Sequence, residues 1–534
     1  MNRILLALAC AGLLQSAGAA DAPAQPEWLR YYQMAADAGD PEAQMKMGWA
    51  FDKGDGVARD PARAVIWYRK AALQNEPTAQ YNLALLLIEG NGVPKDAATG
   101  LDWLTRAASK NLAVAQNYLA ALYEQGLEVP KNDAEAVKWL TRAANKGDAA
   151  AMNNLALKFA NGQGVAKDPA QALKWLTASA QQGNALAQAN LGTVYREGLD
   201  GVAIDYAQAL KWYAAAAQQG NVGAQTKLGW MFFKAQGVEK NLQTAAKWFA
   251  LAAKNGDAGA QTQLGWMAEQ GQGMAQDFLL AAQSYAQAAA QNNALAANNL
   301  GTLYRDGHGV AADPAQAARW FRKAADGGDA NGQYNLAVLL ESAPATETET
   351  LVWYRKAAEQ NMAAAQSRLG WLLLKSGQDG EAVQWLTKAA NQNDVQAQNN
   401  LGVLYESGQG VEKNPATAAQ WYRNAAEAGD AAAQNNLAAL LRDGNGVAQD
   451  PNQAIEWFRK AAAQGYAKAM LNLGNMLERQ AKAAAPAPAA TLLPPLPVPA
   501  AAPHAAPLAA SNAPLSTPLA APVAPVGTPL PAGR

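Results

Sequence analysis

Hydrophobic positions recur along this chain with a period of about three dozen residues. An aromatic anchor marks each period, and successive anchors lie 35 to 37 residues apart, except after Trp320 and Trp353, where the steps are 33 and 32. Within each period, apolar residues twice follow the three-and-four spacing of an amphipathic helix. The pattern therefore predicts a repeat protein made of paired helices. The anchors are Tyr31, Trp67, Trp103, Trp139, Trp175, Trp212, Trp248, Tyr285, Trp320, Trp353, Trp385, Trp421 and Trp457.

The first helix of each period, called helix A, contains the sequence Ala-x-x-x-Leu-Gly, as in residues 187–192. With that alanine counted as position zero, positions zero, four and seven form one apolar stripe. Glycine often stands at position five, although it costs a helix about 1 kcal/mol relative to alanine. We therefore expect a neighbouring helix to approach closely there. The glycines at position five are Gly48, Gly192, Gly229, Gly265, Gly301, Gly370, Gly402 and Gly474.

The second helix, called helix B, carries the anchor followed four and five residues later by two alanines, as in residues 67–72 (Trp-Tyr-Arg-Lys-Ala-Ala). We expect the anchor tryptophans to lie in the core. A Gly-x-Gly loop such as residues 162–164 separates helix A from helix B, because glycine accepts the positive φ that ends a helix. The following Asp168-Pro169 is typical of a helix start, where aspartate caps and proline fits the first turn.

A helical pair of this kind cannot bury its apolar face alone, so successive pairs must stack. The order Ala-x-x-x-Leu-Gly, Gly-x-Gly-Val, Asp and Trp-x-x-x-Ala-Ala resembles the Sel1-like repeat, a relative of the tetratricopeptide repeat. The resemblance covers residues 26–480 and implies an all-α, right-handed α/α superhelical solenoid of about twelve helix-loop-helix repeats. An extra helix B is expected at the start and an extra helix A at the end. Residues 341–350 replace one loop, and residues 376–380 shorten another.

The N-terminal segment differs from the repeats. Residues 1–20 have the features of a secretory signal peptide, because Arg3 precedes an apolar run from 4 to 14 and residues 17–19 (Ala-Gly-Ala) offer a cleavage pattern. The run is shorter than the ~20 residues of a spanning helix, so no membrane span is expected after signal removal. We expect a periplasmic or secreted protein. A lipoprotein anchored through Cys10, the only cysteine, is the open alternative.

The C-terminal segment, residues 481–534, is mostly alanine and proline, with 14 of the 26 prolines and no aromatic residue. This proline density cannot continue a helix, and the composition cannot form a packed core. We expect a disordered, partly polyproline-II tail that serves either as a passive spacer or as a docking segment.

Composition and motifs argue against an enzyme. The 43 Lys and Arg residues nearly balance the 44 Asp and Glu residues, which excludes the clustered positive charge of a nucleic-acid binder. The only histidines are His308, in a loop where other repeats carry Asp, Asn or Gln, and His504, in the tail. Glu347 and Glu349 pair two carboxylates, but in a stretch expected to be flexible. The sequence has no metal-ligand spacing and no nucleophile motif, so no metal or other cofactor is expected.

Positions two and six of helix A point away from the apolar stripe and are the candidates for partner binding. Trp and Tyr are typical of binding hot spots, and asparagine can bond a peptide backbone or a sugar. Alternatively, these residues pack against the next helix A. The candidates form three aromatic patches, Trp49 with Tyr81, Trp230 with Trp266, and Tyr334 with Trp371, and five asparagines, Asn117, Asn153, Asn298, Asn399 and Asn435.

These observations favour an exported, non-enzymatic scaffold or adaptor that binds protein partners in the bacterial envelope. A polysaccharide- or peptidoglycan-associated binding module is the alternative, because aromatic and asparagine side chains also suit sugars. A hydrolase is the third hypothesis, for which the sequence offers no catalytic residues.

Overall fold

The computed structural model describes residues 26–198, 201–341 and 347–484, and the regular elements of this part of the chain are all α-helices. The helices alternate between the two predicted kinds. The helices A are α2 (Pro41–Lys53), α4 (Pro77–Glu89), α6 (Ala113–Gln125), α8 (Ala149–Asn161), α10 (Ala185–Glu197), α12 (Val222–Lys234), α14 (Ala258–Gln270), α16 (Ala294–Asp306), α18 (Ala330–Glu341), α20 (Ala363–Lys375), α22 (Val395–Ser407), α24 (Ala431–Asp443) and α26 (Ala467–Ala484). The helices B are α1 (Glu27–Asp37), α3 (Pro61–Leu73), α5 (Ala97–Ser109), α7 (Asp133–Asn145), α9 (Pro169–Gln181), α11 (Tyr206–Gln218), α13 (Leu242–Lys254), α15 (Phe278–Ala290), α17 (Pro314–Asp326), α19 (Glu347–Glu359), α21 (Asp379–Ala390), α23 (Pro415–Glu427) and α25 (Pro451–Ala463).

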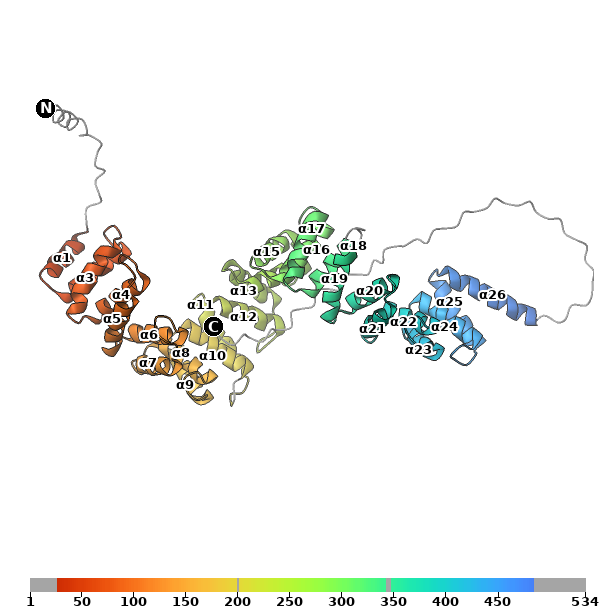
Figure 1. The fold of residues 1–534 in the computed structure, drawn as a ribbon, viewed down its shortest axis with the longest axis horizontal. Coiled ribbons are helices and arrows are strands. Elements are labelled where there is room, and N and C mark those ends of the chain that lie inside the picture. The colour runs from red at the N-terminus through yellow and green to blue at the C-terminus, as the bar shows by residue number, and fades with distance from the viewer. Residues whose placement is uncertain (1–25, 199–200, 342–346, 485–534) are drawn as a thin grey trace, which may run out of the picture.

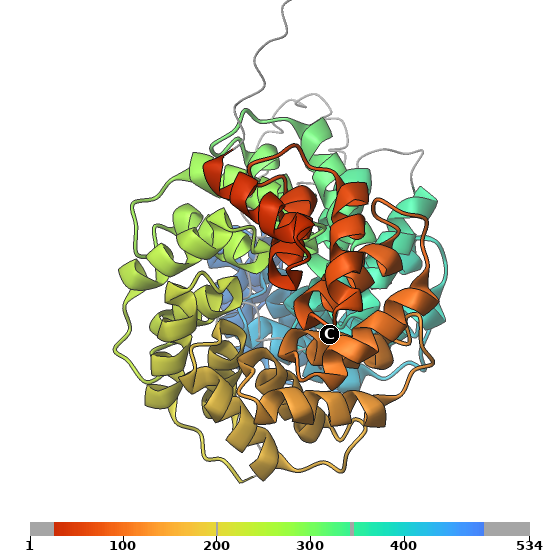
Figure 2. The same ribbon diagram turned by 90° about the vertical axis from the view of Figure 1, so that its left-hand side faces the viewer.

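The helices form one continuous superhelix, because each helix packs on the next one in the chain (Figure 1). Viewed from the N-terminal end in Figure 2, the chain turns clockwise as it recedes, so the superhelix is right-handed. Successive helices A also contact each other directly, as α2 and α4 do. Elements on the inside of a curved stack lie closest together, which places helices A on the inner face. The predicted right-handed all-α solenoid is confirmed.

Local sequence sets the ends of the helices, as the unit of α8 and α9 illustrates. Gly162 ends α8 with a φ of 67°, and Gly164 has a φ of 73°. A Cβ on Gly164 would overlap the carbonyl of Asp133 in the preceding helix B, so only glycine fits. Asp168 then caps α9 by accepting a 3.0 Å hydrogen bond from the Gln171 amide. The roles expected for the Gly-x-Gly loop and the Asp-Pro pair are therefore confirmed.

The centre of each core is the residue after the anchor, not the anchor itself. Tyr68 and Tyr422 are at most 1% exposed, whereas Trp67 and Trp421 are half-buried at the rim of the core. Among the anchors, all within the described residues, only Trp353 is buried among the tryptophans. The expectation that the tryptophans form the core is thus corrected. One helical step of 100° separates the two positions, and the sequence period cannot tell them apart.

The anchor assigned to Tyr285 was also displaced by one residue. Ser284 stands at the anchor position of α15, and Tyr285 is the fully buried ring that follows it. In several other units the rim tryptophan is covered by a basic side chain three residues later, as Lys70 covers Trp67 with its Nζ 4.1 Å from the ring centroid. Such cation–π contacts add about 0.5–1 kcal/mol at exposed sites.

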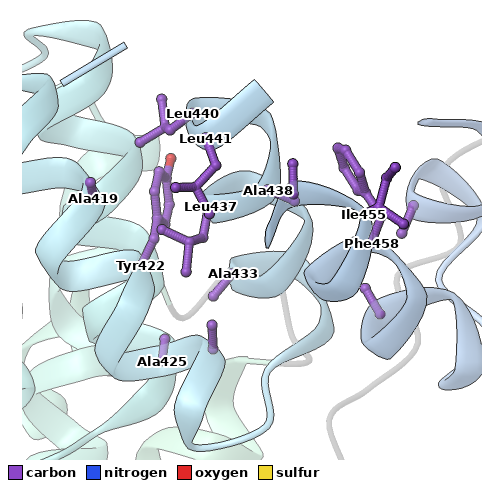
Figure 3. Close-up of a cluster of buried hydrophobic side chains, with 14 of the residues drawn as sticks. Ala419, Tyr422, Ala425, Ala433, Leu437, Ala438, Leu440, Leu441, Ile455 and Phe458 are labelled. Atoms are coloured by element: carbon purple, nitrogen blue, oxygen red, sulfur yellow. The ribbon is translucent and has the colours of Figure 1, made fainter. Parts of the chain in front are cut away.

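The close approach predicted at position five is confirmed at seven of the eight glycines, but not at Gly474, where no described atom lies within 4 Å. The neighbour is a buried ring of helix B in six of the seven and Leu386 at Gly370. A Cβ on Gly48 would lie 2.5 Å from Cδ1 of Tyr68, closer than side chains tolerate. Figure 3 shows the other side of such a ring near the C-terminus, where Tyr422 of α23 lies against Leu437 and its neighbours of the next helix A, α24. Burying one such side chain contributes about 1.5–3 kcal/mol.

A polar feature that recurs inside the stack was not predicted from the sequence. The glutamine at position one of helix A is buried, and its Nε2 donates to a carbonyl at the end of the preceding helix B. Gln116 donates in this way to the Ala108 carbonyl at 2.8 Å. Because the last carbonyls of a helix have no partner within the helix, these glutamines satisfy buried polar atoms at most of the seams. Met152, Ala297 and Met470 replace the glutamine in α8, α16 and α26.

Two further expectations are corrected, one for residues 341–350, which replace a Gly-x-Gly loop, and one for the C-terminal end of the array. Glu347 and Glu349 lie in the first turn of α19, not in a flexible stretch, and Glu349 forms a 2.7 Å ion pair with Arg322. Helix α26 continues to Ala484, beyond the boundary expected at residue 480. The predicted signal peptide (residues 1–20, with Cys10) and all but residues 481–484 of the predicted tail, including His504, lie outside the described residues. Within them, no helix is both long and apolar enough to cross a membrane.

Candidate functional site

Position six of helix A carries large apolar side chains that remain exposed. Trp49 is 45% exposed and Trp371 is 38% exposed. Helices A form the inner face of the superhelix, so these side chains recur along that inner face. Exposed apolar residues that recur on one surface are characteristic of interaction sites. The other exposed residues at this position are Leu157, Val338 and Val403.

The five predicted asparagines lie at the seams between successive helices A. Each accepts a hydrogen bond through Oδ1 from the asparagine at position three of the next helix A, which lies 37 residues later. Asn153, Asn298 and Asn435 are also buried. The bonded amides hold neighbouring repeats in register. This agrees with the alternative that these residues pack against the next helix A. The pairs are Asn154 to Asn117 (3.1 Å), Asn190 to Asn153 (3.0 Å), Asn335 to Asn298 (2.8 Å), Asn436 to Asn399 (3.2 Å) and Asn472 to Asn435 (2.9 Å).

The structure brings the predicted pair Trp230 and Trp266 together through a third ring. Phe233 makes edge-to-face contacts with both, its centroid lying 5.5 Å from that of Trp230 and 5.9 Å from that of Trp266. All three rings are half-buried, and they join two successive helices A, α12 and α14. Phe233 was not predicted, although it lies three residues after Trp230 and hence on the same side of the helix.

Two lysines flank this aromatic group on α12. The Lys234 Nζ lies 5.1 Å from the Trp230 ring centroid, and Lys227 precedes Trp230 by three residues. Within the described residues, neither lysine forms an ion pair. Partial burial and the nearby positive charge of Arg196 lower the pKa of Lys227. Lys227 is thus a cation partly withdrawn from water and close to Arg196, while the carboxylates of Glu197 and Asp257 act in the opposite sense and favour its charge. We call Lys227, Trp230, Phe233, Lys234 and Trp266 the aromatic–basic patch.

The other two predicted aromatic pairs are organised differently. Tyr81 packs edge-to-face on Tyr118 of the next helix A, at a centroid distance of 6.2 Å. Tyr334 packs on the buried Tyr354 at 5.7 Å. Neither Tyr118 nor Tyr354 was predicted as a contact of the inner face.

Basic residues bracket the position-six tryptophan in three helices A. Trp371 has the Arg368 guanidinium 4.5 Å from its ring centroid and the Lys375 Nζ at 5.5 Å. Trp49 has Lys46 and Lys53 at the same spacing in sequence. These brackets were also missed, although the spacing Lys/Arg-x-x-Trp-x-x-x-Lys is visible in the sequence. At Trp49 both lysines pair with carboxylates, Lys46 with Glu42 and Lys53 with Asp52, and Arg368 beside Trp371 pairs with Glu341. Within the described residues, the bracketing cations without an ion pair are Lys375, Lys227 and Lys234.

Potential metal ligands are not clustered in the part of the chain that the structure describes. No group of three His, Cys, Asp or Glu side chains there could hold a metal ion. His308 is exposed, and its ring stacks on Phe278 at a centroid distance of 4.8 Å. The arrangement of the inner face suits binding by surface contact.

The sequence matches the family model of the Sel1 repeat in thirteen segments that run without a break from residue 29 to residue 466. The first segment, 29–40, covers a lone helix B, and each of the others spans a full pair of helices. The chain belongs to the Sel1 repeat family. Sel1 repeats generally mediate contacts between proteins, and members of the family are typically non-catalytic.

Two solved Sel1 repeat structures are similar to this chain. One is c5321, described as a protective antigen present in uropathogenic Escherichia coli strains. It is 35% identical, covers 78% of this chain and 90% of its own, and superposes with a TM-score of 0.70. The other is a Sel1 repeat protein from Oxalobacter formigenes, which is 31% identical over 57% of this chain and 90% of its own, with a TM-score of 0.48. No functionally curated protein matches the sequence.

The positions of the Sel1 unit differ in what they contribute to the structure. Positions zero, four and five form the core of each Sel1 unit, and the asparagines join one unit to the next. Position six varies along the array: Trp230 and Trp266 are half-buried and pack against the core, whereas Trp49, Leu157, Val338, Trp371 and Val403 are exposed. These exposed side chains are the apolar part of position six that remains open to contact in this Sel1 repeat protein.

Proposed function

We propose that this protein is an exported, non-enzymatic scaffold that binds protein partners through the inner face of its superhelix. The observation that carries the proposal is the aromatic–basic patch. Its three rings contact one another, and the Lys234 ammonium lies over the Trp230 ring. Half-buried Lys227, one turn before Trp230, forms no ion pair within the described residues, although the carboxylates of Glu197 and Asp257 act on it. A bound carboxylate would neutralise Lys227, and an apolar side chain of the same partner would cover the rings.

Export is part of the proposal and rests on two supports. Residues 1–20 carry the pattern of a secretory signal peptide. The similar protein c5321 is described as a protective antigen, a description that agrees with export. Fusing residues 1–25 to alkaline phosphatase tests this point, because that enzyme is active only where its disulfides form. An inactive fusion of normal abundance would argue against export.

Affinity capture tests the binding surface. The purified chain would be incubated with envelope extract, and the recovered proteins would be identified by mass spectrometry. We expect the double variant Trp230→Ala/Trp266→Ala to lose the specific partner. Leu251→Ala, which truncates an exposed side chain on helix B of the same unit, should retain it. Equal recovery by the wild type and the double variant, with unchanged helical circular dichroism, would reject the patch as the binding surface.

Binding to a polysaccharide is the second candidate, because aromatic rings on the inner face also suit sugars. Co-sedimentation with purified peptidoglycan separates the two functions. Sedimentation that depends on Trp230 and Trp266, without any recovered protein, would favour the glycan. Capture of a protein that peptidoglycan fragments do not displace would favour the scaffold.

A further inference from the structure

The last helix of the array, α26, is a helix A without a helix B in the described chain. Every other helix A, from α2 to α24, is followed by a helix B that packs along it. The described chain therefore ends with one side of α26 open. Figure 1 shows α26 at the C-terminal end of the superhelix, with described helices on one side of it only.

The open side contains the glycine that elsewhere receives a side chain of helix B. Seven other helices A have glycine at position five, and in six of them a Tyr or Phe ring of the following helix B lies against it. A Cβ on Gly229 would lie 2.7 Å from Cε1 of Phe249, and one on Gly301 would lie 2.7 Å from Cδ1 of Phe321. At Gly370 the contact is made by Leu386. At Gly474 no described atom lies within 4 Å.

The residues around Gly474 are apolar and uncovered. Met470 at position one is 49% exposed and Leu477 at position eight is 39% exposed, and Leu473 at position four is half-buried. The corresponding residues of α4 are at most 3% exposed. Terminal repeats normally present a polar outer face to water, so this end has the composition of an interface. We call Met470, Leu473, Gly474 and Leu477 the terminal seat.

We propose that the terminal seat binds an amphipathic helix of another polypeptide that has the residue pattern of helix B. That pattern is a small residue, a Tyr or Phe four residues later, and an alanine three residues after the ring, as in Ala64, Tyr68 and Ala71 of α3. The seat continues an interface that the molecule forms in each of its internal units. The ring enters the space over Gly474, and the small residues allow the backbones to approach.

Two segments of the protein itself do not fit the seat. Residues 485–534 contain no aromatic residue and 14 prolines, so they cannot supply such a helix. Helix α1 of a second copy has Trp28 where other helices B have a small residue. At that position in α5, even a Cβ on Gly100 would lie 2.7 Å from Ile88 Cγ1 and 3.0 Å from the Ala84 carbonyl. An indole has no room there.

A helical peptide from the protein itself provides the probe. A fluorescein-labelled peptide of residues 413–430 contains α23, in which Ala418, Tyr422 and Ala425 form the pattern. Its binding to the full chain would be followed by fluorescence anisotropy. We expect saturable binding that Gly474→Leu weakens at least about tenfold, because the leucine fills the space of the ring. Leucine is also a better helix former than glycine, so the variant should fold.

Three controls make the result specific. Asn475→Ala changes an exposed neighbour on another side of α26 and should leave peptide binding unchanged. A peptide with Tyr422→Ser should bind at least about tenfold more weakly than the parent. Trp230→Ala/Trp266→Ala should have no effect, so this proposal and the binding function of the inner face can fail separately.

Three outcomes would overturn the proposal. The first is the absence of peptide binding at millimolar concentration, and the second is equal binding by Gly474→Leu. The third is sedimentation of the full chain as a dimer that Gly474→Leu dissociates, which would assign the terminal seat to a second copy.

Discussion

Tyr285 donates a 2.7 Å hydrogen bond through its hydroxyl to Oε2 of Glu269, which joins the core ring of α15 to the last turn of its own helix A. The ring itself lies against Gly265 of the same helix A. Tyr422 makes the equivalent bond to Glu406 at 2.8 Å. The polar atom of a fully buried ring is thus satisfied at the edge of the core, and a glutamate is drawn partly out of water.

The Glu269 carboxylate should make stability depend on pH. Burial raises its pKa from the ordinary 4.5, while the bond from Tyr285 opposes the rise. A carboxyl whose pKa is raised by folding contributes stability that is full below the unfolded pKa and is lost as pH rises through the folded one. We therefore expect wild type to lose stability relative to Glu269→Gln between pH 4.5 and the raised pKa.

Urea unfolding of both proteins across this pH range provides the measurement. Tyr285→Phe removes the opposing hydrogen bond, so it should move the loss to higher pH. Parallel pH profiles for wild type and Glu269→Gln would show that the carboxyl titrates alike in the folded and unfolded states.

The same substitution at two glycines should have opposite effects. Gly402 faces the Tyr422 ring, whereas Gly474 faces no described atom. Gly402→Leu should destabilise the protein by about 3 kcal/mol or more, because a leucine must displace the ring. Gly474→Leu should leave the thermal midpoint unchanged or raise it, since leucine improves helix propensity by nearly 1 kcal/mol. Thermal unfolding followed by circular dichroism compares the two, and a similar loss in both would contradict the open seat.

The asparagine pair Asn298 and Asn335 should be energetically coupled. Asn335 Nδ2 donates to Asn298 Oδ1 at 2.8 Å, and both side chains are buried. A double-mutant cycle with Asn298→Ala and Asn335→Ala should give a coupling of about 0.5–1.5 kcal/mol. Urea denaturation yields the four free energies. Additive effects would mean that the amides contribute separately and that the bond does not hold the repeats together.

Removing the charge of the buried Lys158 should destabilise the protein less than removing the two carboxylates that pair with it. Its ammonium group lies 2.7 Å from Glu124 and 3.3 Å from Asp133, in a side chain that is 4% exposed. Glu124→Gln/Asp133→Asn leaves a buried cation unpaired and should cost about 3 kcal/mol. Lys158→Met removes the charge and should cost less than about 1.5 kcal/mol. Chemical denaturation ranks the variants, and the reverse order would show that the lysine reaches water.

The local architecture could be predicted from the sequence because its causes are local. Gly162 ends a helix and Asp168 caps the next through atoms only a few residues away. The glycines at position five also predicted a close neighbour correctly, since an uncompensated helix penalty implies a steric reason. Because the same sequence pattern recurs in about a dozen units, a pattern that is weak evidence in one unit is strong evidence for the fold of the whole chain.

The contacts of the candidate site residues depend on how each unit is rotated relative to the next. The sequence of a single unit does not specify that rotation. For Asn298 the sequence left open either a binding surface or packing against the next helix A, and in the structure the next helix A brings Asn335 within hydrogen-bonding distance. The core residue was misplaced by one position for the same reason, because Trp67 and Tyr68 are both apolar and only stacking decides which one is enclosed. Phe233 was missed because its role comes from Trp266 on another helix.

The stacking of near-identical units has a consequence for how far apart two partners can be held. Trp230 on α12 and Trp371 on α20 are separated by a fixed number of units, each of which adds a small advance and a small turn. Inserting or deleting one whole unit between them would preserve every contact type while changing both the distance and the angle between the two tryptophans. The number of repeat units thus sets the distance between the two tryptophans. That distance can change in evolution while the tryptophans themselves stay the same.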